Sequence, residues 1–321
     1  MTQQTANGRS DTARRRKVLV AAPTHKRNDL LDGLLKSLNA LTIPEGTDVE
    51  FLIIDNDPAE GARPVVARWQ ETFALPLRYE TERQPGVTHV RNKALDLAEG
   101  FDFLAFIDDD EFADAGWLAA LLARYDATGA AAVFGPVDPI YPNTAPGWMR
   151  DWAVHGTHIP ADEDQLKPGA TCNCLIDLKT VRDTGLRFET RMSLTGGEDT
   201  LFFTRFLDAG YRLTRAKDAR VFEHVPEGRA TPNWLMRRWY RTGITDALIA
   251  GRDMSPAKAR LRGLVHGIVR VAAGSAAVAL VAIATLGNPR QVLARCYTVC
   301  RGAGMISFAF GKQYEEYGRK A

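Results

Sequence analysis

Residues 101–111 have the sequence FDFLAFIDDDE, an apolar run that ends at four consecutive acids, Asp108, Asp109, Asp110 and Glu111. The run is typical of a strand buried in a parallel sheet. Because an unpaired charge is costly to bury, the acids must lie at the carboxyl end of that strand. Clustered carboxylates repel one another unless a cation or hydrogen-bonding ligand compensates them, and Mg²⁺ or Mn²⁺ suits them. A solvated acidic turn is the alternative for this stretch alone.

Strands and helices alternate on the N-terminal side of this stretch. Strands are predicted at residues 17–22, 49–54 and 77–82, and helices around residues 30–38, 65–69 and 87–98. This order predicts an α/β fold with a doubly wound, mostly parallel sheet and right-handed crossovers. Such sheets bind ligands over the carboxyl ends of their strands, where Pro23–Arg27, Asp55–Asp57 and Asp108–Glu111 all fall.

The following part of the chain is less regular. We expect strands at residues 131–137, 171–178, 212–216 and 220–225, and a long functional loop at 139–168. Gly196-Gly197 opens a helix that ends at Gly210, and a basic, aromatic helix is predicted at residues 232–243.

Charge is distributed unevenly along the 321 residues, although the net charge is only +2 and favours no nucleic acid partner. Residues 229–321 contain 15 Lys/Arg and 4 Asp/Glu, a net charge of +11, which leaves 26 against 35, or −9, for the rest. A basic tail indicates an anionic partner, and the inner membrane surface is the obvious candidate.

The C-terminal part is also apolar. Residues 271–289 carry no charge, and a helix of 17 residues ending at Gly287 would span roughly 25 Å, less than the roughly 30 Å hydrocarbon core. A second apolar stretch covers residues 296–310. A marginal transmembrane helix, a monotopic hairpin in the bilayer interface and a buried soluble helix pair all remain open.

The four cysteines, Cys172, Cys174, Cys296 and Cys300, are best explained as reduced thiols of a cytosolic protein. A four-thiolate zinc site is conceivable, but the spacing is not C-x-x-C. Residues 1–16 are polar, lack the apolar core of a signal peptide, and are predicted to form a disordered tail.

Further candidate residues lie outside the acid run. Glu198 and Asp199 follow two glycines at a predicted helix N-terminus, where a carboxylate is either a simple dipole partner or a general base. Arg91 lies about one turn into a helix and is within reach of an anion at the helix mouth. Arg229 and Arg238 are candidate phosphate ligands, and His224 is a metal or phosphate partner or, more often for a lone histidine, structural.

Taken together, these motifs resemble glycosyltransferase family 2, which has the GT-A fold. The matching segments follow the family's order and cover about residues 18–243: Pro23–Arg27, Ile53–Asn56, Pro85–Asn92, Phe106–Asp110 and Gly197–Asp199. Within the family the chain most resembles the succinoglycan-type exopolysaccharide glucosyltransferases, which act on a lipid carrier at the cytoplasmic face of the cell membrane.

The resemblance implies a role for each matching position. Asp199 would be the catalytic base, with Glu198 beside it. Asp110, helped by Asp108, would bind Mn²⁺ or Mg²⁺. The donor-nucleotide site would use Pro23, His25, Asp55 and Asn56 around the base, Asp108 and Asp109 at the ribose, and Arg91.

Two positions depart from the family pattern. His25 stands where the family often has Tyr, which puts base stacking in doubt. Leu235 occupies the Gln position of the Q-x-x-R-W signature of processive synthases, although Arg238-Trp239 is present. With at most one or two membrane helices as well, polymer extrusion is not expected.

The sequence thus predicts a disordered tail at residues 1–16, a GT-A catalytic domain at 17–230 and a basic, apolar helical region at 231–321. The expected activity is inverting, metal-dependent transfer from a nucleotide-sugar, UDP-linked, to a saccharide acceptor. A polyprenyl-diphosphate-linked acceptor and a location at the cytoplasmic face of the membrane are implied. A nucleotidyl or phosphoryl transferase, disfavoured because no glycine-rich loop follows the first strand, and a non-catalytic membrane scaffold are the alternatives.

Overall fold

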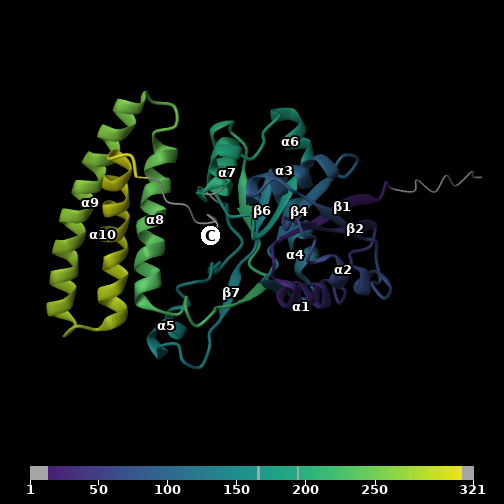
Figure 1. The fold of residues 1–321 in the computed structure, drawn as a ribbon, viewed down its shortest axis with the longest axis horizontal. Helices are drawn as coiled ribbons and strands as arrows, with labels where there is room; N and C mark the ends of the chain where they lie inside the picture. Colours follow the sequence, from purple (N-terminus) through teal and green to yellow (C-terminus); the bar gives the residue numbers. More distant parts are fainter. Residues whose placement is uncertain (1–13, 165–166, 194, 313–321) are drawn as a thin grey trace, which may run out of the picture.

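The computed structural model describes residues 14–164, 167–193 and 195–312. A seven-stranded sheet has the order β3-β2-β1-β4-β8-β6-β9 (Figure 1). Its strands are β1 (Arg16–Thr24), β2 (Thr47–Asp55), β3 (Leu77–Thr81), β4 (Phe103–Ile107), β6 (Ala132–Phe134), β8 (Asn173–Asp177) and β9 (Leu213–Arg215). Only β8 pairs antiparallel with its neighbours, β4 and β6. The predicted doubly wound, mostly parallel sheet is confirmed.

Helices cover both faces of the large sheet. One face packs against α1 (Asn28–Leu38), α2 (Arg63–Gln70) and α4 (Trp117–Thr128). The other face packs against α3 (Val87–Leu97), α6 (Leu178–Thr184) and α7 (Glu198–Asp208). Side chains of β1 alternate between the two cores, with Val18 and Val20 in one and Leu19 and Ala21 in the other, as the two-residue period of a strand requires.

A smaller sheet has the order β5-β10-β7 and lies beside the carboxyl end of β4. It consists of β5 (Glu111–Ala113), β7 (Val137–Ile140) and β10 (Val221–His224). The single strand predicted at 131–137 is thus divided between β6 and β7, which belong to different sheets. Short helices α5 (Gly147–Trp152) and η1 (Thr190–Met192) interrupt the connections, and α5 falls within the predicted long loop.

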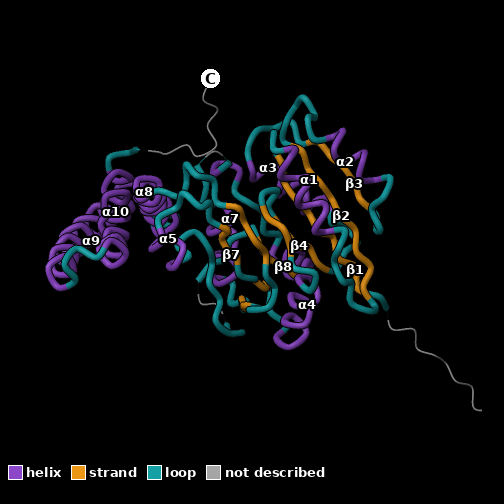
Figure 2. Tube along the Cα trace, turned by 90° about the horizontal axis from the view of Figure 1, so that it is seen from below, coloured by secondary structure: helices purple, strands orange, loops and turns teal. Residues whose placement is uncertain are grey.

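Three long helices form a layer at one end of the molecule: α8 (Pro232–Ala250), α9 (Pro256–Ala284) and α10 (Pro289–Ala309). Figures 1 and 2 show α8 nearest the sheets and α9 farthest from them, with α10 between. The side chains of Thr231 and Asn288 cap α8 and α10, and a proline opens each helix, as is common at the first helical position.

Several predicted boundaries are corrected. The helix predicted at 232–243 continues to Ala250, and the apolar helix predicted from residue 271 is the second half of a helix that begins at Pro256. β1 begins at Arg16, one residue before the expected start of the catalytic domain. Residues 1–13 of the predicted tail, and residues 313–321, lie outside the described residues.

Candidate functional site

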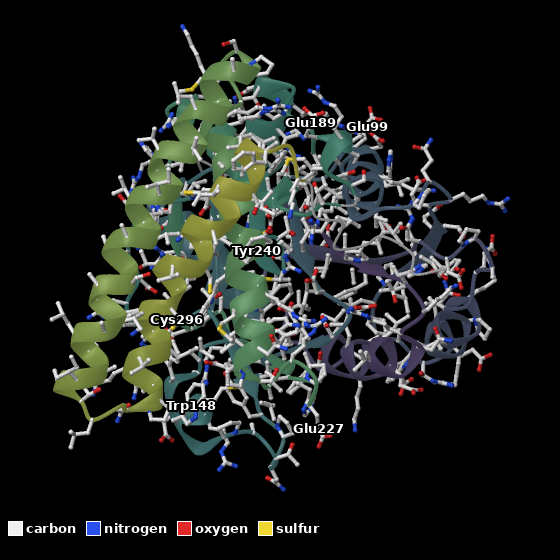
Figure 3. The ribbon with its side chains drawn as sticks, turned by 60° about the vertical axis from the view of Figure 1, so that its left-hand side comes forward. Glu99, Trp148, Glu189, Glu227, Tyr240 and Cys296 are labelled. Atoms are coloured by element: carbon white, nitrogen blue, oxygen red, sulfur yellow. The ribbon has the colours of Figure 1, made fainter. Side chains whose placement is uncertain are left out.

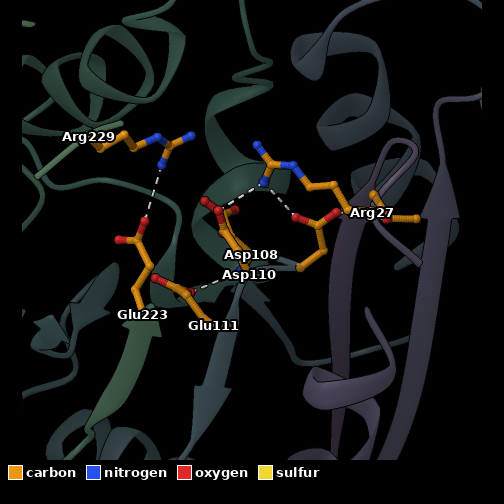
Figure 4. A network of polar contacts seen from close by, with 8 residues as sticks. Arg27, Asp108, Asp110, Glu111, Glu223 and Arg229 are labelled. Atoms are coloured by element: carbon orange, nitrogen blue, oxygen red, sulfur yellow. Dashed lines mark hydrogen bonds and ion pairs between the residues drawn. The ribbon is translucent and has the colours of Figure 1, made fainter. Parts of the chain in front are cut away.

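The acid run forms a tight turn between β4 and β5 at the carboxyl edge of the large sheet. Asp109 is 4% exposed, and its Oδ2 accepts a hydrogen bond of 2.7 Å from the Thr24 hydroxyl at the end of β1. Arg27 donates to Asp109 Oδ1 at 3.0 Å and to Asp110 Oδ2 at 2.9 Å (Figure 4). The expectation that the β1 and β4 ends share one site is therefore met, through side chains from both strands.

Asp108 and Glu111 are joined across the turn, and Glu111 is the first residue of β5. The backbone N–H of Asp108 donates to Glu111 Oε2 at 3.0 Å. Burial raises the pKa of Asp108 to about 7; Arg91 opposes that rise, and the Asp110, Asp109 and Glu223 carboxylates add to it. The pKa of Glu111 is raised well above its usual range by burial and then by Asp108. These acids therefore lack the positive charge needed to keep them all ionised at neutral pH.

Glu223 is a member of this cluster that the sequence did not predict. It lies on β10, directly opposite Glu111 on β5, and two carboxylates facing each other across strands are destabilising. Arg229 donates to Glu223 Oε1 at 3.3 Å, while burial and Asp110 raise the pKa of Glu223 (Figure 4). Arg238 also lies close enough to lower that pKa, so the two predicted phosphate-binding arginines, Arg229 and Arg238, border the acid cluster.

The structure does not bring His224 to the acids, which corrects its assignment as a phosphate or metal partner. Successive side chains of a strand point to opposite faces, so His224 faces away from Glu223. Its exposed ring lies 5.5 Å from the Phe112 ring, which stacks on Phe222.

Arg91 and Glu198 form a buried ion pair between α3 and α7. The Arg91 guanidinium donates to Glu198 Oε1, and the two residues are 5% and 3% exposed. Burial raises the pKa of Glu198, Arg91 opposes the shift, and Asp199 adds to it. Arg91 thus occupies the space between the acid run and the start of α7 instead of projecting from the helix mouth.

Asp199 is the second residue of α7, which packs on the same face of the large sheet as α3. Its Oδ1 accepts the backbone N–H of Thr200 at 2.6 Å, while no hydrogen bond to Oδ2 forms within the described part of the chain. Burial raises the pKa of the Cys172 thiol well above its usual range, and the next causes are the carboxylates of Glu111, Asp108 and Asp199. The Cys172 thiol is therefore close to both the acid run and Asp199, although these are about ninety residues apart in sequence.

Two glycines, one before α7 and one before α3, allow close packing of the loop that leads into α7. Gly197 has a φ of +90°, and a Cβ there would lie 2.2 Å from Thr245 of α8. Gly86, with a φ of +117°, lies against Ser193, and the Thr88 and Ser193 hydroxyls are hydrogen-bonded. The loop before α7 is thereby held against both α3 and α8.

Asp55 and Asn56, predicted to surround the base, make internal hydrogen bonds. Asp55 is fully buried and accepts from the backbone of Asp57 and Ala62 and from the Tyr79 hydroxyl at 2.8, 3.0 and 2.9 Å. The Asn56 amide bonds to Glu82, Gln84 and Gly86. Both residues shape the carboxyl end of β2, so their direct contact with a base remains a prediction.

Pro23 and His25 lie at the end of β1, where His25 is exposed. An open cleft of about 580 Å³ adjoins them and is lined by residues 26–30, Asp57 and Gly61. Arg27 lines this cleft and also pairs with Asp109 and Asp110, so one side chain connects the cleft to the acid run.

The donor set of this site fits a hard divalent cation. Neighbouring carboxylates add to the raised pKa of Asp108, Glu111 and Glu223, and a cation would relieve that excess of negative charge. In residues 14–164, 167–193 and 195–312, no three His, Cys, Asp or Glu side chains already converge on a metal position. Arg27 provides the positive charge at Asp110 instead. The zinc alternative fails, because Cys172 and Cys174 pack in separate sheet cores and Cys296 and Cys300 in the helical layer.

Sequence comparisons identify a matching family and two relatives. The sequence model for "Glycosyl transferase family 2" matches residues 19–181. The succinoglycan biosynthesis protein ExoM of Rhizobium meliloti (strain 1021) is 34% identical over 298 residues, which are 92% of this chain and 94% of that protein. The glycosyltransferase AglE of Haloferax volcanii is 26% identical over 202 residues, 63% of this chain and 64% of its own length.

Solved structures with the same architecture share little sequence with this chain. The mannosyltransferase PcManGT from Pyrobaculum calidifontis, in complex with GDP-Man and Mn²⁺, has a TM-score of 0.57 and 22% identity, over 89% of this chain and 86% of that one. S. aureus TarS 1-349 in complex with UDP-GlcNAc has a TM-score of 0.52 and 18% identity, over 76% and 69% of the two chains. The predicted GT-A fold is confirmed.

Proposed function

This chain belongs to glycosyl transferase family 2 and is a glycosyltransferase, and we propose that it moves a sugar from a UDP-sugar to a saccharide hydroxyl with inversion at the anomeric carbon. One observation carries the proposal: the start of α7 lies close to the acid run, since Arg91 pairs with Glu198 and also acts on Asp108, and the carboxylates of Glu111, Asp108 and Asp199 all add to the rise that burial causes in the pKa of Cys172. A base and a donor-binding acid run that act on one molecule must lie this close to each other.

Asp199 is the proposed general base. The N–H of Thr200 holds Oδ1, which fixes the carboxylate and leaves Oδ2 to accept the proton of the acceptor hydroxyl. Glu198 is a positioning residue in this proposal, since its carboxylate pairs with Arg91 rather than facing the acceptor. As the proton moves to Asp199, the acceptor oxygen attacks the anomeric carbon from the side opposite the departing diphosphate.

Asp110 and Asp108 are the proposed ligands of Mn²⁺ or Mg²⁺. The metal, when bound, neutralises charge on the leaving diphosphate. Arg27 must then leave Asp110, to which it donates at 2.9 Å, and its half-exposed side chain has room to turn toward the cleft. Arg229 and Arg238, at the border of the acid cluster, are the proposed diphosphate contacts.

The nucleoside is proposed to lie over the edge of β1 and β2. Asp108 and Asp109 would accept hydrogen bonds from the ribose hydroxyls, as carboxylates suit. Pro23 and His25 would contact the base, while Asp55 and Asn56 would hold the surrounding loop through their internal hydrogen bonds. In this proposal the nucleotide base binds where the sequence predicts, but Asp55 supports the surrounding loop instead of contacting the base.

The acceptor is proposed to be a saccharide on a polyprenyl diphosphate, at the cytoplasmic face of the cell membrane. Two features support this part: the name of the relative ExoM, which refers to succinoglycan biosynthesis, and the basic C-terminal layer beside the site. The product would enter a cell-surface polysaccharide or glycoconjugate.

The test is to change Asp199 to Asn and compare it with Asp183→Asn, an exposed acid of α6. We expect Asp199→Asn to lower turnover by roughly 1,000-fold, since general base catalysis contributes about 10²–10⁴-fold. Calorimetric affinity for UDP with Mn²⁺ should change by less than about twofold, because the base does not hold the donor. Near-normal turnover in Asp199→Asn would refute the assignment, and an α-linked product from an α-linked donor would refute inversion.

A further inference from the structure

Helix α9 exposes an apolar stripe along the side that faces away from the molecule. The stripe includes Leu261, Val265, Ile268 and Val269, which are 62%, 49%, 53% and 60% exposed, and it continues through Leu280 and Ile283 at 69% and 77%. At 100° per residue these positions fall within one sector of about 120°. Within the described residues, α9 is also the one helix long and apolar enough to cross a membrane.

The opposite side of α9 is lined by glycines that pack closely on α10. Gly263, Gly267 and Gly274 are buried. A Cβ at Gly267 would lie 2.7 Å from the Gly302 carbonyl, and one at Gly274 would lie 2.9 Å from Val299. Figure 3 views this layer from its outer side, with Tyr240 on α8 and Cys296 on α10 labelled. The stripe is therefore the outermost surface of the layer, and α10 covers only the glycine side.

Charge along this helical hairpin has a single sign. Residues 256–309 contain seven Lys/Arg and no Asp/Glu. With Leu261 at 0° on that projection the stripe runs from about −20° to 100°, Arg262 lies at about 100° and Arg260 at about 260°, so basic groups border its first half on both sides. Lys258, at about 60°, lies within the sector one turn before Leu261 and caps the N-terminal end of the stripe. An apolar face with basic borders is complementary to an anionic lipid surface.

We propose that α9 binds an anionic lipid bilayer by lying flat in its interface, with the stripe in the acyl boundary and the flanking basic groups at the headgroups. This inference does not depend on the transferase reaction. Of the three arrangements that the sequence leaves open, a transmembrane helix, a monotopic hairpin and a buried soluble helix pair, this proposal favours the monotopic hairpin.

A spanning arrangement conflicts with the attachment of α10 to α8. A Cβ at Gly243 of α8 would lie 2.0 Å from the Arg301 carbonyl of α10, and the Arg301 guanidinium pairs with Asp246 of α8. Insertion of α9 across the bilayer would carry this ion pair and Arg270 toward the hydrocarbon, which is costly for charged groups. In addition, 29 residues extend about 44 Å, and only the second half of α9 is uncharged.

A second copy of the chain is a poorer occupant of the stripe. Two such faces brought together would set the basic borders of one against those of the other, with no acid in residues 256–309 to pair with them. Like charges so placed oppose association.

Vesicle flotation without donor or acceptor tests the proposal. We compare the wild type with Val265→Glu/Ile268→Glu and with a matched control, Ala67→Glu/Ala123→Glu, which adds the same charge at exposed positions of α2 and α4. With vesicles of phosphatidylcholine and phosphatidylglycerol, the stripe variant should bind at least about tenfold more weakly and the control like the wild type. Vesicles of phosphatidylcholine alone should bind the wild type more weakly. Equal binding by the stripe variant, at an unchanged melting temperature, would overturn the inference.

A second measurement separates lying flat from spanning. Leu286 is 97% exposed at the C-terminal end of α9, so Leu286→Cys introduces a thiol there. A membrane-impermeant maleimide outside sealed vesicles should label this cysteine above the wild-type background without detergent. Protection until detergent is added would establish spanning instead, and a dimer that the stripe variant dissociates would assign the stripe to a second copy. A failure in either assay leaves the proposed reaction untouched, because neither measures turnover.

Discussion

The acid cluster and the helical layer handle charge in opposite ways. Around β4 and β10, five carboxylates (Asp108, Asp109, Asp110, Glu111 and Glu223) are drawn together and only partly compensated by arginines. In the hairpin of α9 and α10, seven basic residues have no acid within the same segment. Each region thus carries an imbalance that a ligand of opposite sign would correct, a cation in the first and anionic lipid in the second. The net charge of the chain is only +2 because these two local excesses of charge nearly cancel.

The two regions also differ in how deeply they bury an ion pair, and the largest expected effect follows from this. The Arg91 and Glu198 side chains are 6% and 4% exposed, against 20% and 25% for Arg301 and Asp246. We predict that Arg91→Met lowers the free energy of unfolding by about 3–5 kcal/mol, because it leaves a buried carboxylate without its partner. Urea unfolding at constant pH measures the change.

Arg301→Met is the matched control in the helical layer. Its loss should be about 1 kcal/mol, since water already screens that pair. Equal losses of stability in Arg91→Met and Arg301→Met would show that the deeper burial of the Arg91–Glu198 pair does not increase its contribution to stability. If Arg91→Met lost donor affinity but no stability, Arg91 would act as the anion ligand that the family resemblance implies.

Much of the site edge could be predicted because it follows from strand ends. Apolar runs that stop at polar residues place residues 23–27, 55–57 and 108–111 at one sheet edge, and Thr24, Arg27 and Asp109 do meet there. Glu223 could not be found in this way. Its strand belongs to a second sheet, and only the pairing with Glu111 shows which of Glu223 and His224 faces the acids. The sequence does show that neighbouring side chains of β10 point to opposite faces of the strand. It does not show which of the two faces is turned toward the acid cluster.

The second-largest expected effect is on donor binding. It should distinguish the two residues predicted to contact phosphate, Arg229 and His224. We expect Arg229→Gln to weaken UDP binding in the presence of Mn²⁺ about tenfold, or about 1.4 kcal/mol, because a cation beside the acid cluster is lost. His224→Gln should change it less than about twofold, since that ring packs on Phe112 outside the cluster. Titration calorimetry gives both values, and the reverse order would restore His224 to the site.

The helical layer was harder to predict than the sheet. The charged residues before residue 271 hid the first half of α9, although they lie beside the stripe or, as Lys258 does, at its N-terminal end. Only the packing of Gly263, Gly267 and Gly274 on α10 shows which side of α9 faces outward. The hydropathy pattern of α9 identifies its apolar residues, but it does not show that α10 covers the glycine side of the helix.

His155 lies where the two regions join, and it should give the smallest effect. Its Nε2 donates to the Arg229 carbonyl at 3.0 Å, its Nδ1 accepts from the Tyr141 hydroxyl at 2.9 Å, and Trp234 of α8 stacks on the ring. Because a carbonyl can only accept, the proton of the neutral imidazole lies on Nε2, which leaves Nδ1 as the acceptor for the Tyr141 hydroxyl. Burial lowers the pKa of His155 to about 4, from an ordinary 6.5.

Stability should therefore fall as the pH falls from about 6.5 toward 4, because the unfolded chain takes up a proton that the folded chain excludes. Well above pH 6.5 the ring is neutral in both states and contributes no pH dependence. We predict that the wild type loses about 1 kcal/mol more than His155→Gln between pH 6.5 and 5.5, measured by urea unfolding at each pH. Parallel curves for the two proteins would mean that the ring accepts its proton without disturbing the contact between the Arg229 loop and α8. The helical layer would then be joined to the acid cluster less firmly than the hydrogen bonds of His155 imply.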